Sequence, residues 1–242
     1  MSPSRHDEVA EELRSRIRSG QIVDVLPTME ELGEDFHVGR ATIRRALQTL
    51  TGEGLIEGRS GQLKRVRREN RMEWSMATLE LRRTSEDGWA DDVRERGQTP
   101  SVEIAIHLTP ADQETAAALE IELGAQTLQQ SGLRRVDGHP HHLTDTYFPR
   151  WLVDAHAEFA TSQDPSTHGA LLNAAGLSQA YYDDDITARM PGPEETQQLK
   201  ISPGVPLLIH ARTAYDADDR PLRYVRSRVP ADRVNLRYQV KA

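Results

Sequence analysis

Arginines are concentrated in one short stretch of this chain, residues 39–58, which reads GRATIRRALQTLTGEGLIEG. Apolar residues recur there at positions i, i+3, i+4 and i+7, which predicts a helix with one buried face. At about 100° per residue, longer polar side chains fall on the opposite face. An arginine on such a face can donate two hydrogen bonds to O6 and N7 of a guanine in a DNA major groove. The buried face comprises Ile43, Ala46, Leu47 and Leu50, and the opposite face Ala41, Arg44, Arg45 and Gln48.

The charge distribution also indicates a nucleic-acid contact. The 242 residues carry a formal net charge of −8. Residues 1–71 carry +1, the remainder carries −9, and residues 40–68 hold eight basic side chains against two acidic ones. Basic charge confined to one region of an otherwise acidic protein is expected of a surface that contacts DNA.

Two predicted helices precede this arginine-rich helix. Residues 7–19 space their apolar side chains by four, which predicts the first helix. Thr28 followed by Glu31 forms a capping box that starts the second, and a tight turn at FHVG follows it. A short helix, a tight turn and a second helix with long polar side chains form a helix-turn-helix, whose second helix can enter a major groove.

A basic hairpin is predicted directly after these helices. The segment LIEGRSGQLKRVRR, residues 55–68, reads as two short strands joined by a glycine turn. Such a hairpin beside a helix-turn-helix is a wing that can follow the DNA phosphates. Its basic residues are Arg59, Lys64, Arg65, Arg67 and Arg68.

Residues 6–66 resemble the winged helix-turn-helix of GntR-type bacterial transcription factors, through the motifs LPTMEEL, VGRATIRRALQTLTGEGLI and GRSG. The resemblance implies DNA contacts by Arg40, Thr42 and Arg44, and places Gly61 at the wing tip. The chain departs from the family pattern at Gly39, where a serine is usual, at Glu30, where the family often has a DNA-contacting arginine, and in the wing sequence GQLK. We therefore expect DNA contacts from Arg40, Thr42, Arg44, Arg45, Gln48, Gly61, Lys64 and Arg65.

The remaining two thirds contain an internal repeat. ETAAALEIELGAQTL, residues 114–128, aligns with EETQQLKISPGVPLL, residues 194–208, at an offset of 80. Each copy reads as helix, turn, strand, hairpin turn and strand. Two related hairpins most simply share one antiparallel sheet, which predicts an α+β domain with flanking helices.

Residues 76–238 resemble UTRA, the effector-binding domain of the HutC subfamily, through ERGQTPSVEI, RVDGHPHHLTDTYFP, STHGALL and YDADDRPLRYVRSRV. The resemblance implies a chorismate-lyase-like fold and a repressor that dimerises and changes its grip on DNA when a small metabolite binds. We expect a DNA-binding domain at 1–68, a linker at 69–75 and an effector-binding and dimerisation domain at 76–242.

The resemblance also implies effector contacts, although the chain departs from the family pattern. Gly132 stands for the first arginine of the family's R-L-R pattern, and Thr144 for a common glutamate. Arg223 stands for a second glutamate and His168 for a frequent tyrosine. This balance predicts an anionic effector; in the alternative, Arg223 points to solvent and pairs with Asp218 or Asp219. The expected effector contacts are Arg134, Ser166, His168, Arg223 and Tyr224.

Three alternatives stay open. In HPHH, strand alternation puts His139 and His141 on one face and His142 on the other, so that Zn²⁺ could bind the first two with Asp145; the competing interpretation is a polar hairpin turn. The fold resemblance admits a lyase, but no catalytic set stands out. The missing family residues also admit a repressor whose effector site has decayed.

Several absences narrow the expectations further. The chain has no cysteine, so it has neither disulfides nor thiolate metal sites. No stretch matches a signal peptide or a membrane helix. We expect a cytoplasmic homodimer that binds a pseudo-palindromic double-stranded operator and needs no metal or cofactor.

Overall fold

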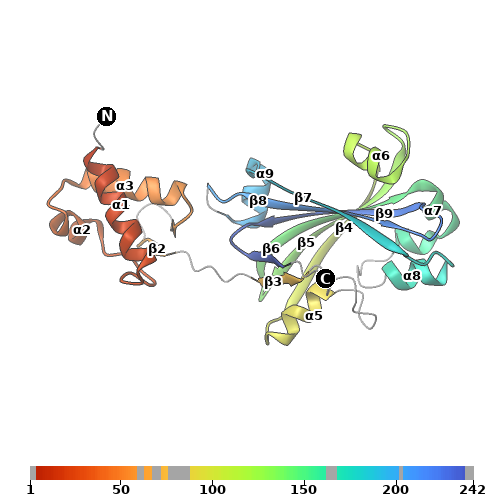
Figure 1. The fold of residues 1–242 in the computed structure, drawn as a ribbon, viewed down its shortest axis with the longest axis horizontal. Coiled ribbons are helices and arrows are strands. Elements are labelled where there is room, and N and C mark those ends of the chain that lie inside the picture. The colour runs from red at the N-terminus through yellow and green to blue at the C-terminus, as the bar shows by residue number, and fades with distance from the viewer. Residues whose placement is uncertain are drawn as a thin grey trace, which may run out of the picture. The chain divides into compact units, whose positions relative to one another are not determined.

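The structure, a computed structural model, forms two compact units (Figure 1). One comprises residues 1–70 with 190–205, and the other residues 71–189 with 206–242. The break after residue 70 falls inside the segment 69–75 that we expected to be a linker. The residues described are 4–58, 63–66, 72–75, 88–161, 168–201 and 204–237.

Three helices and a short hairpin make up most of the first unit. Strand β1 pairs with β2 in an antiparallel ladder, and Val25 forms an isolated bridge with Arg65, so a third segment joins the wing. The helices pack around one apolar core that includes Leu13, Leu32 and Ile43. The elements are α1 (Arg5–Arg18), α2 (Met29–Asp35), α3 (Arg40–Gly52), β1 (Ile56–Glu57) and β2 (Arg65–Val66).

Local sequence determines where α2 and α3 begin. The Thr28 side chain accepts a hydrogen bond from the Glu31 backbone N–H at 3.2 Å, and Glu31 Oε2 accepts one from the Thr28 backbone N–H at 2.7 Å. This is the capping box that the sequence predicted. The turn between the helices contains His37 in the left-handed region, at φ 52°. The chain thereby reverses within a few residues and starts α3 after Gly39.

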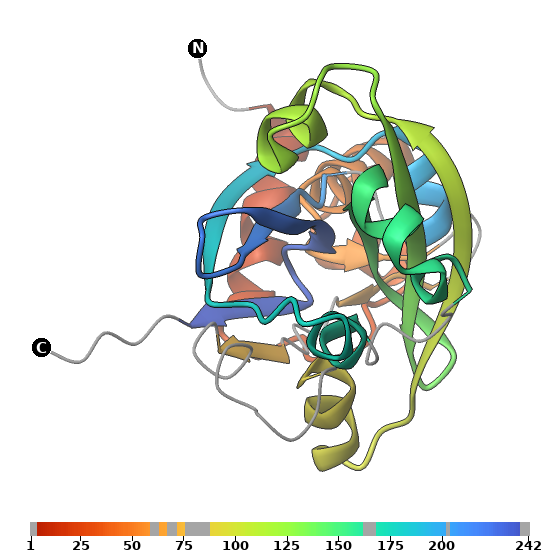
Figure 2. The ribbon, with the colours of Figure 1, turned by 90° about the vertical axis from the view of Figure 1, so that its right-hand side faces the viewer.

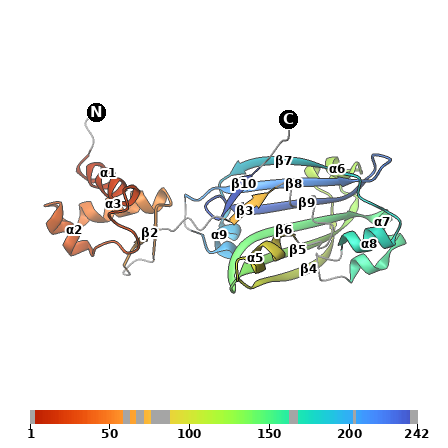
Figure 3. The same cartoon turned by 60° about the horizontal axis from the view of Figure 1, so that its bottom comes forward.

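A six-stranded antiparallel sheet dominates the second unit (Figure 3). The strand order is β4-β5-β6-β9-β8-β7. This combination of helices and an antiparallel sheet confirms the predicted α+β class. The elements are α5 (Gly88–Glu95), β4 (Pro100–Pro110), α6 (Gln113–Leu119), β5 (Gln126–Val136), β6 (His139–Pro149), α7 (Arg150–Ala155), η1 (Ala157–Ala160), α8 (His168–Ala174), β7 (Tyr181–Arg189), β8 (Leu207–Tyr215) and β9 (Pro221–Pro230), with α9 (Pro193–Leu199) in segment 190–205.

The two faces of this sheet have different neighbours. Helix α6 lies on one side, whereas α5 and α8 lie on the other (Figures 1 and 2). Leu128 of β5 packs in one cluster with Phe159 and Leu172, and we call its side of the sheet the α8 face. Tyr147 of β6 packs with Leu119 of α6, and we call that side the α6 face. Because successive side chains of a strand point to opposite faces, the pairing register then shows to which face each remaining side chain of the sheet belongs.

The internal repeat is visible in the topology. Strands β4, β5 and β6 in one half correspond to β7, β8 and β9 in the other, and β6 pairs with β9 at the centre. Glu120 and Lys200, 80 residues apart, both end their helices in the left-handed conformation. The pairing register also shifts at Arg134/Arg135 and at Ala214/Tyr215, again 80 residues apart. The sequence repeat therefore corresponds to two halves with the same fold.

Part of the expected linker is a strand. Residues 72–75 form β3 (Met72–Ser75), which pairs in parallel with β10 (Val234–Arg237). Met72 and Trp74 are buried while Glu73 is exposed, which is the alternation of a half-buried strand. The sequence analysis expected no strand within this linker; two large apolar side chains in alternation stabilise one at residues 72–75.

Candidate DNA-binding and effector sites

Helix α3 presents the polar face that the sequence predicted. Ile43, Ala46, Leu47 and Leu50 are buried in the core of the first unit. On the other side Arg40, Arg44, Arg45 and Gln48 are exposed, and Thr42 is half-buried. Within the described residues, no ion pair or hydrogen bond engages the guanidinium group of Arg40, Arg44 or Arg45. These guanidinium groups are therefore available to a nucleic acid.

Other arginines of the same unit serve the fold. Arg14 of α1 binds Glu53 after α3 through two hydrogen bonds, of 3.0 and 2.6 Å. Arg16 binds Asp35 of α2 at 2.5 Å, and its guanidinium lies 4.9 Å from the ring centre of Phe36. These contacts tie α1 to the other two helices. Arg14 and Arg16 therefore hold the helices together, unlike the exposed arginines of α3.

The wing contributes further basic groups. Arg65 is exposed and only loosely paired with Asp24, at 3.9 Å. Lys64 donates to the backbone carbonyl of Gly58, the residue that follows β1. Gly61, expected at the wing tip, lies outside the described residues.

Arg134 and His168 lie on the same face of the second unit. Arg134 points to the α8 face of β5 and is 7% exposed, while His168 begins α8 and is 2% exposed. His168 Nε2 lies 2.7 Å from Gln130 Oε1, and Gln130 donates to the carbonyl of Phe159 at 2.9 Å. Because Gln130 uses its amide N–H there, His168 is the donor in their hydrogen bond. The structure thus places two of the expected effector residues on one face with a third polar group between them.

The other expected effector residues do not all lie on this face. Register places Arg223 on the α8 face, opposite Ala214. Tyr224 lies on the α6 face, where it stacks on Tyr147 and donates a hydrogen bond to Glu114. It therefore does not line a site with Arg134, because adjacent residues of a strand point to opposite faces. Ser166 lies outside the described residues.

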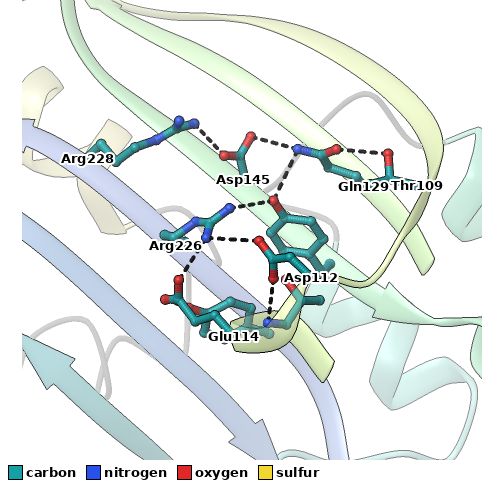
Figure 4. Close-up of polar contacts among 10 residues, drawn as sticks. Thr109, Asp112, Glu114, Gln129, Asp145, Arg226 and Arg228 are labelled. Carbon is teal, nitrogen blue, oxygen red and sulfur yellow. Dashed lines mark hydrogen bonds and ion pairs between the residues drawn. The ribbon is translucent and has the colours of Figure 1, made fainter. Parts of the chain in front are cut away.

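The α6 face carries a continuous polar network (Figure 4). Arg226 donates to Glu114 at 2.9 Å and to the Tyr147 hydroxyl at 2.9 Å. Gln129 and Arg228 both donate to Asp145, which lies directly across the central strand pair from Arg226. Each carboxylate of the network accepts from at least one donor, whereas the buried Nε atoms of Arg226 and Arg228 have no hydrogen-bond partner among the described residues. This network joins α6 to β6 and β9 and explains the burial of Tyr224.

A β-bulge changes the expected arrangement of the histidines. Arg134 pairs with His142 and Arg135 with Pro140, so His141 is the extra residue. His141 and His142 therefore contact each other, with their Nδ1 atoms 2.8 Å apart, while His139 is exposed. Our expectation that His139 and His141 share a face away from His142 was wrong for this reason. Within the described residues, no cluster of three His, Asp or Glu side chains is arranged to hold a metal ion.

Both buried histidines are neutral at physiological pH. Burial lowers the pKa of His141 to about 4, and the cations Arg233 and Arg134 add to the effect. Complete burial and the same cations hold the pKa of His142 well below its usual range. Cationic character on this part of the α8 face therefore comes from arginine and not from imidazolium.

Sequence reasoning missed a second polar group on the α8 face. Asp184 of β7 accepts two hydrogen bonds from Arg212, at 2.7 and 2.6 Å, and contacts His210 Nε2 at 2.8 Å. These hydrogen bonds outweigh burial and hold the pKa of the Asp184 carboxyl well below its usual range. The repeat offset offered a signal, since Arg212 in the second copy corresponds to Gly132 in the first.

Positive charge predominates on the α8 face of the six strands. Asp184 is the one carboxylate that the described strands direct to this side, and it is paired with Arg212. Arg134 and Arg223 add two further cations on the same side. The six strands thus direct three arginines and one carboxylate to the α8 face, and arginine is a residue type that binds anions well.

A winged helix-turn-helix with free arginines, followed by a separate α+β unit, defines a DNA-binding regulator with a sensory domain. The bacterial regulatory proteins of the gntR family match residues 5–65, and the UTRA domain matches residues 95–235. The chain belongs to the GntR family and carries a UTRA domain. It is a DNA-binding transcriptional regulator and not an enzyme.

Several relatives match this chain over nearly its whole length and their own. An HTH-type transcriptional regulator of Rhizobium meliloti, RB1450, is 30% identical over 96% of this chain and 93% of its own. The transcriptional repressor NagR of Bacillus subtilis is 25% identical over 93% and 90%. The crystal structure of PhnF from Mycobacterium smegmatis matches with a TM-score of 0.59 at 25% identity, over 97% of this chain and 99% of that chain.

Proposed function

We propose that this regulator is a repressor whose grip on operator DNA changes when a small anionic metabolite binds to the α8 face. The repressor assignment is supported by relatives named as repressors, PhnF of Mycolicibacterium smegmatis and NagR of Bacillus subtilis. The proposed effector contacts are Arg134, His168 and Arg223, with Ser166 as a further expected contact. The proposed DNA contacts are Arg40, Thr42, Arg44, Arg45, Gln48, Gly61, Lys64 and Arg65.

The arginines that point to the α8 face support the anion proposal. Arg134 is buried against the ring of Trp89, 5.0 Å from its centre, so water screens its charge poorly. A carboxylate or phosphate that reaches Arg134 would form a charge-assisted hydrogen bond, which is about twice as strong as a neutral one. The whole chain is acidic, so the preference comes from local geometry.

A metabolite screen by thermal shift tests the proposal. A ligand that binds the native state stabilises it by RT ln(1 + [L]/Kd), and we expect acidic metabolites to give the shift. Arg134→Ala should abolish the shift while leaving operator binding intact, and Arg135→Ala, on the opposite face of β5, is the matched control. A neutral or cationic effector, or a full response in Arg134→Ala, would overturn the assignment.

A repressor without an inducer is the second candidate. The observation that favours it is the departure of this chain from the family pattern at Gly132, Thr144 and His168. The same screen distinguishes the two candidates, because a decayed site predicts no thermal shift with any metabolite and unchanged operator binding.

We further propose that the protein acts in the cytoplasm as a homodimer on a pseudo-palindromic operator. No helix among the described residues could span a membrane.

A further inference from the structure

Two buried indole N–H groups on the α8 face have no hydrogen-bond acceptor within the described part of the chain. They belong to Trp74 of β3 and Trp89 of α5, which are 4% and 5% exposed. A buried tryptophan N–H usually finds a partner, because an unpaired donor costs about 1–3 kcal/mol. Both groups are therefore donors that a ligand oxygen could engage.

The two indoles surround one imidazole. The ring centres of Trp74 and Trp89 each lie 5.1 Å from that of His142, with interplanar angles of 87° and 80°. Arg134, which pairs with His142 across the strands, lies over the ring of Trp89. Thr144, the next residue of β6 on this face, has a buried hydroxyl that also has no partner among the described residues. Three unpaired donors and one cation thus gather around His142.

Trp74 differs from the other donors because of its position in the chain. It belongs to β3, whose first residue, Met72, follows the N-terminal segment 1–70 of the first unit by two residues. Parallel pairing with β10 holds β3 against the second unit, and the Trp74 ring also reaches His210, 6.5 Å away between ring centres. A contact made by Trp74 is therefore a contact made by the segment that leads out of the DNA-binding domain.

We propose that Trp74 is a binding residue for the effector, to which its indole N–H donates a hydrogen bond at an anionic oxygen that Arg134 also binds. The inference rests on the proposed function and adds a contact from the segment that joins the two domains. Ligand binding then strengthens the attachment of β3 to the second unit. In the competing arrangement, the N–H points at the face of the neutral His142 ring and the residue serves packing alone.

Phosphate binding to the full-length protein tests the inference. The probe is inorganic phosphate, titrated by thermal shift against chloride at equal ionic strength. Trp74→Phe removes the N–H and keeps a ring, and benzothienylalanine at position 74 removes it while keeping the bicyclic shape. Trp151→Phe is the ring control; Trp151 belongs to α7, and its ring contacts the guanidinium of Arg220. Arg134→Ala removes the proposed cation. We expect both changes at position 74 to weaken phosphate binding by about tenfold, since hydrogen bonds to charged groups are worth that much or more.

Each outcome decides between the claims. Binding that is lost in Arg134→Ala but unchanged in both position-74 variants would overturn the role of Trp74 and leave the proposed function standing. A parent protein that millimolar phosphate does not stabilise would overturn the anion site and this inference together. An equal loss in Trp151→Phe would show a general effect of ring truncation and would also overturn the role of Trp74.

Hydrogen exchange supplies a readout that a packing role would not change. In the parent, phosphate should slow exchange of the backbone amides of residues 72–75, because the bound ligand holds β3 in place. In the benzothienylalanine variant the same amides should exchange at equal rates with and without phosphate. Equal protection in both proteins would contradict the inference.

Discussion

The arginines of the first unit differ in whether their guanidinium groups form ion pairs with carboxylates. The guanidinium groups of Arg14 and Arg16 form ion pairs with Glu53, just after α3, and with Asp35 of α2. They therefore stabilise the arrangement of α1, α2 and α3. Arg44 and Arg45 have no such partners among the described residues. The same residue type thus has a structural role in α1 and a proposed DNA-binding role in α3, and mutations should separate the two.

Arg44→Ala should weaken operator binding without unfolding the domain. If Arg44 contacts a base edge, we expect a loss of about 1–3 kcal/mol for the operator and a smaller loss for unrelated DNA. Fluorescence anisotropy with both DNAs measures the difference. Arg65→Ala is the contrasting variant, because a phosphate contact should weaken all sequences alike and reduce the salt dependence. Unchanged operator binding in both variants would exclude this face.

His141 and His142 should make the second unit sensitive to mild acid. Their pKa values are lowered in the folded state, so the unfolded chain binds protons first as the pH falls. Stability should be constant above pH about 6.5 and fall by up to about 1.4 kcal/mol per pH unit for each histidine as the pH decreases towards 4. Urea unfolding at several pH values measures the slope. His142→Gln should flatten it, whereas a change at the exposed His139 should not; parallel slopes would contradict the assignment.

Residue roles could be predicted where local pattern determines orientation. The exposed arginines of α3 follow from helical spacing alone. Tyr224 could not be placed, because its face depends on which strands become neighbours and in which register. The buried donors of Trp74 and Trp89 were equally invisible, since only the folded sheet brings them to His142.

At the scale of elements, the capping box of α2 positions the helix that precedes α3. Thr28→Ala removes one acceptor for a free backbone N–H, so we expect a loss of about 0.5–2 kcal/mol in unfolding free energy. Chemical denaturation measures it, and Thr49→Ala, within α3, is the control. Operator affinity should fall only as far as the folded fraction does. A stability equal to that of the parent would show that the cap is dispensable.

Most elements followed from periodicity and from the repeat, whereas the β-bulges did not. The offset of 80 predicted two equivalent hairpins, and the sheet order confirms them. The bulge at His141 is defined by how two strands pair, so it could not be predicted from the sequence alone. Strand β3 was missed because its partner, β10, lies far along the chain.

For the whole molecule we expect a two-fold dimer on DNA. Two copies of α3 would read half-sites about one helical turn, roughly 10 base pairs, apart or a multiple of that. Sedimentation equilibrium and footprinting measure the assembly and the protected sites. A monomer that protects a single unpaired half-site would contradict the prediction.

The pairing of β3 with β10 has a consequence for synthesis on the ribosome. Residues 1–70 emerge first and can fold while the rest of the chain is still being translated, since domains generally fold as units. Strand β3 emerges next, yet its partner at 234–237 appears only when translation is nearly finished. A nascent chain can therefore carry a folded DNA-binding domain before β3 has paired with β10 of the effector-binding domain. Ribosome-bound chains stalled before residue 234 should hold a folded reader that no metabolite can yet control.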